Sequence, residues 1–166
     1  MDPIMARRSI RKYRSDVLQG DVLERLVEAG MAAPCANGRR SWHFVVIDDR
    51  ELLDAVPKFH PYSKMVLEAP AAILVCADPE VEPTEGYWAQ NCSAATENIL
   101  VEATGMGLGT VWLGIYPRTD RIEAMRKLLS VPEDIVPFSL IVVGRPAEKK
   151  EPHGGIDRQR LHWNGW

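Results

Sequence analysis

Four short apolar runs constrain the fold of this chain most, because runs of this length and composition are typical of strands in a covered sheet. The runs are Trp42–Ile47, Ala71–Ala77, Thr110–Leu113 and Phe138–Val143. The first is apolar apart from His43, and we expect it to form a buried strand. Because helical patterns separate the runs, the sequence predicts interleaved strands and helices in an α/β or α+β layer structure.

Helical patterns fill most of the chain between these runs. Asp2 and Pro3 are typical of an N-cap and a first helical position, and they predict a short helix at the start. From Asp21 apolar residues recur at helical spacing, and this helix must end by Ala33 because Pro34 disfavours helical geometry before it. Further helices are expected over Glu51–Val56, over Tyr87–Thr104, and from a capping pair of Asp120 with Glu123, whereas residues 57–68 give no consistent pattern.

The size and composition of the chain fit a single domain over residues 1–166. Of these residues 46% are hydrophobic and 26% are charged, which is ordinary for a globular protein that buries a sizeable core. The apolar runs are too short to cross a bilayer and the start of the chain lacks an apolar signal core, so we expect no membrane association and a cytoplasmic protein. The 3 cysteines are widely spaced, as reduced thiols are, and the 4 histidines lack ligand spacing, so no metal site is predicted.

A basic segment, Arg7–Tyr13, stands out in a chain whose net charge is −3. It holds three arginines, a lysine and the hydroxyl group of Ser9. Guanidinium groups match phosphate oxygens two at a time, and a neighbouring serine can donate to a further oxygen. The segment therefore indicates a site for one small anion, with a solvated basic turn as the alternative. The acidic net charge and the absence of a second basic stretch with interleaved aromatics argue against binding to nucleic acid.

Two other motifs carry no chemistry by themselves. Gly105–Gly109 has the glycine spacing of a dinucleotide-binding turn, but it follows a helix and precedes a strand, the reverse of the order that phosphate binding needs. We interpret it as a helix end with close backbone packing. Cys35 lies near Arg39, Arg40 and His43, a basic setting that favours a reactive thiolate, yet no partner base can be assigned from the sequence.

Taken in order, seven short motifs resemble the nitroreductase family of FMN-dependent oxidoreductases in its short, single-domain form. The resemblance spans nearly the whole chain at similar spacing, and each motif alone is weak. The motifs are Arg7–Tyr13, Ala33–Ala36, Trp42–Phe44, Glu68–Pro70, Gly107–Gly114, Val143–Glu148 and Arg160–Trp163.

The resemblance implies an α+β fold whose central sheet is mixed, mostly antiparallel and flanked by helices. It also implies an obligate, domain-swapped homodimer with FMN bound in two pockets at the subunit interface. The tail, from about residue 147 to residue 166, carries Trp163 and Trp166 beyond a pair of glycines. Because two tryptophans need burial, we expect the tail to pack on the partner subunit, and a tail folded back on its own domain is the alternative.

The resemblance implies that the basic segment binds the phosphate of the flavin. Arg7 would hold the phosphate, and Arg8 and Ser9 would contact the phosphate and the ribityl chain. Arg11 would approach the pyrimidine edge of the isoalloxazine ring, where reduced flavin carries negative charge near N1. His153 stands where relatives commonly supply a basic residue to the phosphate.

Two further segments complete the implied flavin site. Backbone amides near flavin N5 would come from the third strand run, at Trp112, Leu113 and Gly114. The flavin edge would be covered by a loop of the other subunit, formed by Pro34, Cys35, Ala36, Asn37 and Gly38. This chain departs from the family pattern by having Gly38, Arg40 and Ser41 where relatives often have amides and a proline.

The activity implied by the resemblance is hydride transfer from NADH or NADPH through flavin N5 to a small acceptor, of the nitroaromatic or quinone type, by a ping-pong mechanism. The chain would need no catalytic residue of its own, because the cofactor supplies the chemistry and the protein binds, orients and tunes it. The alternative function is that of a flavin-binding carrier or sensor without turnover.

Overall fold

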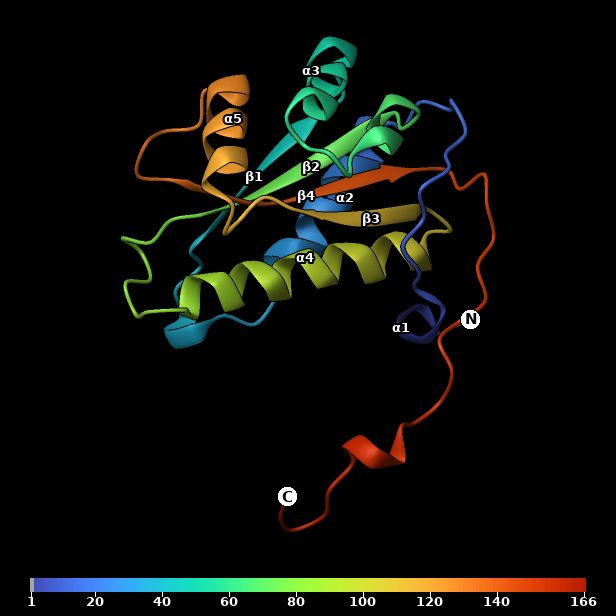
Figure 1. The fold of residues 1–166 in the computed structure, drawn as a ribbon, viewed down its shortest axis with the longest axis vertical. Coiled ribbons are helices and arrows are strands. Elements are labelled where there is room, and N and C mark those ends of the chain that lie inside the picture. The colour runs from blue at the N-terminus through green and yellow to red at the C-terminus, as the bar shows by residue number, and fades with distance from the viewer. Residues whose placement is uncertain (1) are drawn as a thin grey trace.

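The structure is a computed structural model that describes residues 2–166, and it contains one four-stranded sheet with helices on both faces (Figure 1). The strands are β1 (Trp42–Ile47), β2 (Ala71–Ala77), β3 (Gly109–Gly114) and β4 (Val136–Gly144), in the order β1-β2-β4-β3. All three pairs of adjacent strands are antiparallel, and the α+β fold is confirmed. Within residues 2–166, parallel pairing is limited to a single bridge between Ser9 and Thr110.

The helices lie where the sequence predicts them, to within two residues at their ends. They are α1 (Pro3–Ala6), α2 (Gly20–Met31), α3 (Arg50–Ala55), α4 (Tyr87–Gly105) and α5 (Thr119–Leu129). Short 3₁₀ turns occupy Ala36–Gly38, Val56–Lys58, Lys64–Leu67 and Arg158–Arg160.

The two predicted helix caps have different outcomes. Asp2 is the N-cap of α1 and accepts a hydrogen bond from the backbone N of Ile4 at 2.9 Å, as predicted. The capping pair predicted for α5 is wrong. Arg118 is the N-cap there, so Asp120 lies inside the first turn and accepts from Arg118 Nε at 3.4 Å, while Glu123 pairs with a later arginine of the helix.

Two hydrophobic clusters occupy the two faces of the sheet. Every residue of β2 is buried, and its side chains alternate between the clusters, with Ile73 on one face and Leu74 on the other. Residues of α2 and α4 cover the first face, and residues of α3 and α5 cover the second (Figure 1). The expectation of a buried strand at β1 is wrong for its middle, where His43 and Val46 are exposed, because β1 is an edge strand.

The tail leaves the domain after Lys150, slightly later than the predicted start near residue 147. Before that point the chain runs beside the N-terminal segment, with the backbone N of Ala147 donating to the carbonyl of Lys12 at 2.9 Å. Figure 1 shows the last residues extending away from the body of the domain. Trp163 is 80% and Trp166 is 104% exposed, so the tail does not fold back on its own domain.

Candidate functional site

The basic segment lies against β3, the strand at one edge of the sheet. The backbone N of Ile10 donates to the carbonyl of Thr110 at 2.8 Å. Gly109 permits this approach, because a Cβ atom there would lie 2.8 Å from Cγ2 of Ile10. Gly107 has φ 73°, in the left-handed region that favours glycine. The interpretation of Gly105–Gly109 as a helix end with close backbone packing is confirmed.

A cavity of about 490 Å³ opens where the basic segment passes the end of β3, and we call it the β3 cavity. It brings Arg11 together with the segment Trp112–Gly114, two parts of the site that the sequence places a hundred residues apart. The cavity is lined by Arg11, His60, Pro61, Tyr62, Lys64, Met65, Trp112, Leu113, Gly114 and Arg121.

The charge in the β3 cavity is positive. Its lining includes Arg11, Lys64 and Arg121 and no acidic residue. Among residues 2–166, no carboxylate forms an ion pair with any of these three side chains. Together with the rings of Tyr62 and Trp112, these cations suit a planar ligand that carries negative charge.

Two side chains meet at the carbonyl oxygen of Gly114, the last residue of β3. Nη1 of Arg121 donates to it at 2.8 Å, and Nε2 of His60 lies 3.1 Å from it. A carbonyl oxygen only accepts, so the Nε2 atom of His60 carries the proton of this bond. Burial, together with the positive charge of Arg121, lowers the pKa of His60 and favours its neutral form.

Arg7 lies at the C-terminal end of α1 and pairs with α4. Its Nε atom lies 3.1 Å from Oε1 of Glu97. From Arg7 to Arg11 the chain advances four residues, which in extended conformation spans about 13 Å. This spacing suits a ligand with a charged group at one end and a planar ring at the other. Ser9 is half-buried, and its carbonyl accepts from Nζ of Lys150 at 2.6 Å.

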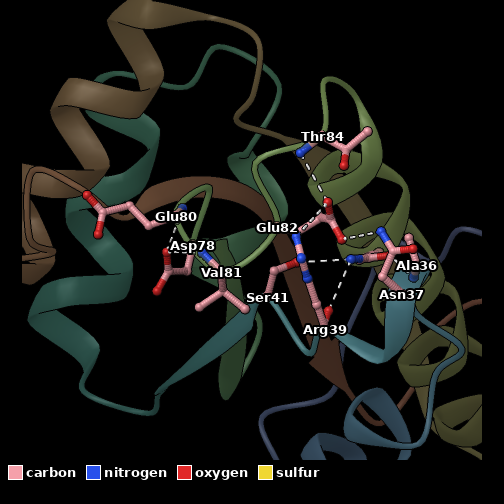
Figure 2. A network of polar contacts seen from close by, with 10 residues as sticks. Ala36, Asn37, Arg39, Ser41, Asp78, Glu80, Val81, Glu82 and Thr84 are labelled. Atoms are coloured by element: carbon pink, nitrogen blue, oxygen red, sulfur yellow. Dashed lines mark hydrogen bonds and ion pairs between the residues drawn. The ribbon is translucent and has the colours of Figure 1, made fainter.

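The loop Pro34–Ser41 is fixed by a second polar network, shown in Figure 2. The carboxylate of Glu82, a residue with no exposed surface, accepts from Nδ2 of Asn37 at 3.1 Å and from the backbone N of Thr84 at 3.0 Å. The hydrogen bonds from Thr84 and then Asn37 outweigh burial and lower the pKa of Glu82. Asn37 has φ 55°, so Glu82 holds the residue at which the loop turns.

Asn91 on α4 holds the backbone of the same loop. Its Oδ1 atom accepts from the backbone N of Ala36 at 2.8 Å. Its Nδ2 atom donates to Oγ of Ser41 at 3.0 Å and to the carbonyl of Arg39 at 3.3 Å. One buried amide therefore contacts the loop at three points along its length.

The other predicted site residues lie apart from the β3 cavity within this chain. None of Pro34–Gly38 lines it, so one copy of the chain does not bring the loop and the cavity together. Cys35 is half-buried and packs against the core cluster of α2 and α4, and the nearby His43 pairs instead with Asp78 at 3.9 Å. His153 is exposed on the tail.

Six residues that line the cavity and the two that hold the loop were not predicted from the sequence. His60, Tyr62 and Lys64 come from the stretch without periodicity, and Arg121 lies on the face of α5 turned toward the end of β3. A concentration of polar and aromatic residues in an irregular segment between two covered elements was the available signal. Glu82 and Asn91 gave no signal, because their role depends on contacts between distant segments.

Comparison with known proteins shows where this fold belongs. A sequence model of the Nitroreductase family matches residues 4–62 and 58–145. A Methanothermobacter thermautotrophicus protein provisionally named NADH dehydrogenase/NAD(P)H nitroreductase is 43% identical over 166 residues, which is 100% of this chain and 87% of that protein. The chain belongs to the Nitroreductase family.

Solved structures agree with this assignment. The structure of a protein with the same provisional name from Parabacteroides distasonis superposes with a TM-score of 0.94 at 40% identity, covering 99% of this chain and 96% of that chain. An FMN-dependent nitroreductase from Clostridium difficile superposes with a TM-score of 0.92 at 28% identity, covering 99% of both chains. No helix within residues 2–166 has the length and apolar character needed to span a membrane.

Proposed function

We propose that this protein is an FMN-dependent oxidoreductase that uses NADH or NADPH to reduce a small acceptor of the nitroaromatic or quinone type. The observation that carries the proposal is the β3 cavity, where three unpaired cations and two aromatic rings adjoin the edge of a strand. Family membership supports it, and so does the name of the FMN-dependent structural relative.

The residues present fit FMN. The terminal nitrogens of Arg7 suit a phosphate, with Arg8 and Ser9 beside them, and Arg11 lies in the cavity that suits the ring. When bound, FMN supplies the redox chemistry by accepting a hydride at N5 from the nicotinamide and passing it to the acceptor.

The protein binds and orients the flavin and provides positive charge beside it. The backbone of Trp112–Gly114 offers the ring a rigid edge, since β4 holds the strand on its other side. Arg11 stabilises negative charge at the pyrimidine edge of the ring. A cavity open to solvent lets the nicotinamide leave before the acceptor enters, as a ping-pong mechanism requires.

A homodimer completes the proposed site. The loop Pro34–Gly38 of one subunit covers the flavin edge of the other, and the tail with Trp163 and Trp166 packs on the partner. Two nearly fully exposed tryptophans on an extended segment support this, because such surface favours burial in an interface. The tail also carries His153, which in the dimer would lie near the phosphate.

Initial-velocity kinetics test the proposed mechanism. With NADPH or NADH varied at several quinone concentrations, double-reciprocal plots are expected to give parallel lines, and anaerobic NAD(P)H is expected to bleach the flavin without an acceptor. Intersecting lines would contradict the ping-pong mechanism. A protein that binds FMN but is not reduced by either nucleotide would instead support the alternative, a flavin-binding carrier or sensor.

A further inference from the structure

The carbonyl of Gly114 is held by donors from two separate elements. His60 comes from the segment between β1 and β2, and Arg121 comes from the first turn of α5. We propose that these are positioning residues that fix the end of β3 for the ligand. We also propose that the positive charge of Arg121 stabilises negative charge on that ligand. This inference rests on the proposed function, because the ligand it concerns is the flavin of the β3 cavity.

Arg121 keeps its positive charge without an ion-pair partner within residues 2–166. The neighbouring Asp120 accepts instead from Nε of Arg118 at 3.4 Å. Arg121 is held by neutral groups, namely the Gly114 carbonyl and the ring of Tyr62, whose centroid lies 5.8 Å from its Cζ atom. The guanidinium is therefore fixed at the cavity wall while its positive charge remains available to whatever the cavity holds.

The arrangement of His60 and Arg121 at Gly114 is not the one that stability alone would favour. Nε of Arg121 and Nδ1 of His60 are both buried and have no hydrogen-bond partner within residues 2–166. Buried polar atoms are nearly always satisfied, and each exception calls for an explanation, of which a role in redox chemistry or catalysis is one. The two side chains share one acceptor and lie in one cavity, so their common purpose is at the end of β3.

His60 and Arg121 make different contributions at the carbonyl of Gly114. Neutral His60 adds a second donor at Gly114 without adding a second positive charge. The peptide that follows Gly114 is thereby fixed from outside the sheet, while Ile115 and Tyr116 donate to the carbonyl of Phe138 from inside it. We therefore expect His60 to contribute only position, and Arg121 to contribute both position and charge.

Hydrogen exchange on the protein without flavin tests the positioning role. In R121M and in H60L, the amides of Ile115 and Tyr116 are expected to exchange about tenfold faster than in the wild type. The control is R118M, which removes an exposed arginine one helical turn away that does not line the cavity. Unchanged exchange in R121M and H60L, or an equal increase in R118M, would overturn the positioning role.

The midpoint potential of the FMN-loaded protein tests the role of the charge. In R121M the ratio of reduced to oxidised flavin at a fixed solution potential is expected to fall about tenfold, which is about 30 mV for a two-electron couple. R121K keeps the charge, so its potential should stay closer to the wild-type value than that of R121M, and R118M should retain the wild-type potential. An R121M potential equal to that of the wild type would overturn the role of Arg121.

The outcomes of these two experiments distinguish failure of this inference from failure of the proposed function. If wild-type protein binds no FMN, the proposed function and the redox role of Arg121 fall together, while the exchange comparison still decides whether the two donors fix the end of β3. If FMN binds and the exchange rates of the variants match the wild type, the proposed function stands and the positioning role is overturned.

Discussion

The end of β3 and the loop Pro34–Ser41 are each held by polar side chains from other elements, but the chemistry that holds them is opposite. At β3 the donors are His60 and Arg121, and they converge on one carbonyl. In the loop a carboxylate, Glu82, and an amide, Asn91, hold the chain at several points. One region is fixed by a cation and the other by an anion.

The two arrangements differ in the charge that remains available to act on a ligand. Glu82 is satisfied by donors of the loop and by Thr84, and Arg39 lies 3.7 Å away, so little negative charge remains to act on a ligand. Arg121 donates to a neutral carbonyl and keeps its full charge at the β3 cavity. The loop therefore offers a ligand only a shape, whereas the cavity offers it both a shape and a positive electrostatic field.

The largest expected effect is that of R11M on the midpoint potential of bound FMN. A cation about 4 Å from a unit negative charge stabilises it by up to about 4 kcal/mol at an effective dielectric of 20. For a two-electron couple this corresponds to a fall of up to about 90 mV when the charge is removed. R14M is the matched control, because Arg14 pairs with Asp16 and does not line the cavity. Equal potentials in R11M and the wild type would show that the positive charge of Arg11 does not act on the flavin.

The next effect is that of N91A on stability. Truncation leaves the backbone N of Ala36 without its acceptor and Oγ of Ser41 without its donor, at a cost of about 2 to 3 kcal/mol. For a domain of this size we expect a fall in Tm of about 5 to 10 °C by differential scanning calorimetry. S93A, which removes one hydrogen bond to the carbonyl of Ala89 on the same helix, should lower Tm much less. Similar losses in both variants would mean that the loop is not specially anchored.

The variant E82Q tests whether the charge of Glu82 acts only within the loop or also on the flavin. Because the charge of Glu82 is used within the loop, we expect the midpoint potential of bound FMN to stay unchanged, in contrast to R11M. Proteolysis of the loop should become faster, since Gln holds the Asn37 amide and the Thr84 N–H less strongly than a carboxylate does. E80Q, at an exposed position nearby, is the control. A potential shift in E82Q as large as that in R11M would show that the charge of Glu82 also acts on the flavin.

The smallest expected effect is the contribution of His60 to the pH dependence of stability. Its pKa is lowered in the folded protein, so near the ordinary value of 6.5 the unfolded chain binds more protons than the folded one. Stability from this residue is therefore full above pH 6.5 and is lost as the pH falls below it. Urea unfolding between pH 8 and pH 5.5 should show this loss in the wild type and less of it in H60Q. Identical profiles would show that His60 does not contribute.

Much of the fold could be predicted from the sequence, because its signals are local. The apolar runs of β2 and β4, the Asp2 cap and the glycines after α4 each act through near neighbours in the chain. The capping pair at Asp120 failed because Arg118 begins the helix earlier. The edge position of β1 was not predictable, because strand order depends on packing across the whole sheet.

The site was predictable only in part, for the same reason. Arg11 and Trp112–Gly114 carry a family pattern, and the structure brings them into one cavity. His60 and Arg121 carry no pattern, and they matter through a single carbonyl oxygen that only the folded chain brings near both. The partner loop and the tail stay predictions, since their role requires a second copy of the chain.

Titration of the apoprotein with FMN tests the central claim most directly. The account predicts a saturable change in flavin absorbance and fluorescence that reaches one FMN per chain. It also predicts weaker binding in R7A, by about thirtyfold or more for the loss of a charged hydrogen bond to phosphate, and unchanged binding in R14A. No spectral change at high micromolar FMN, or equal affinity in R7A and the wild type, would contradict it.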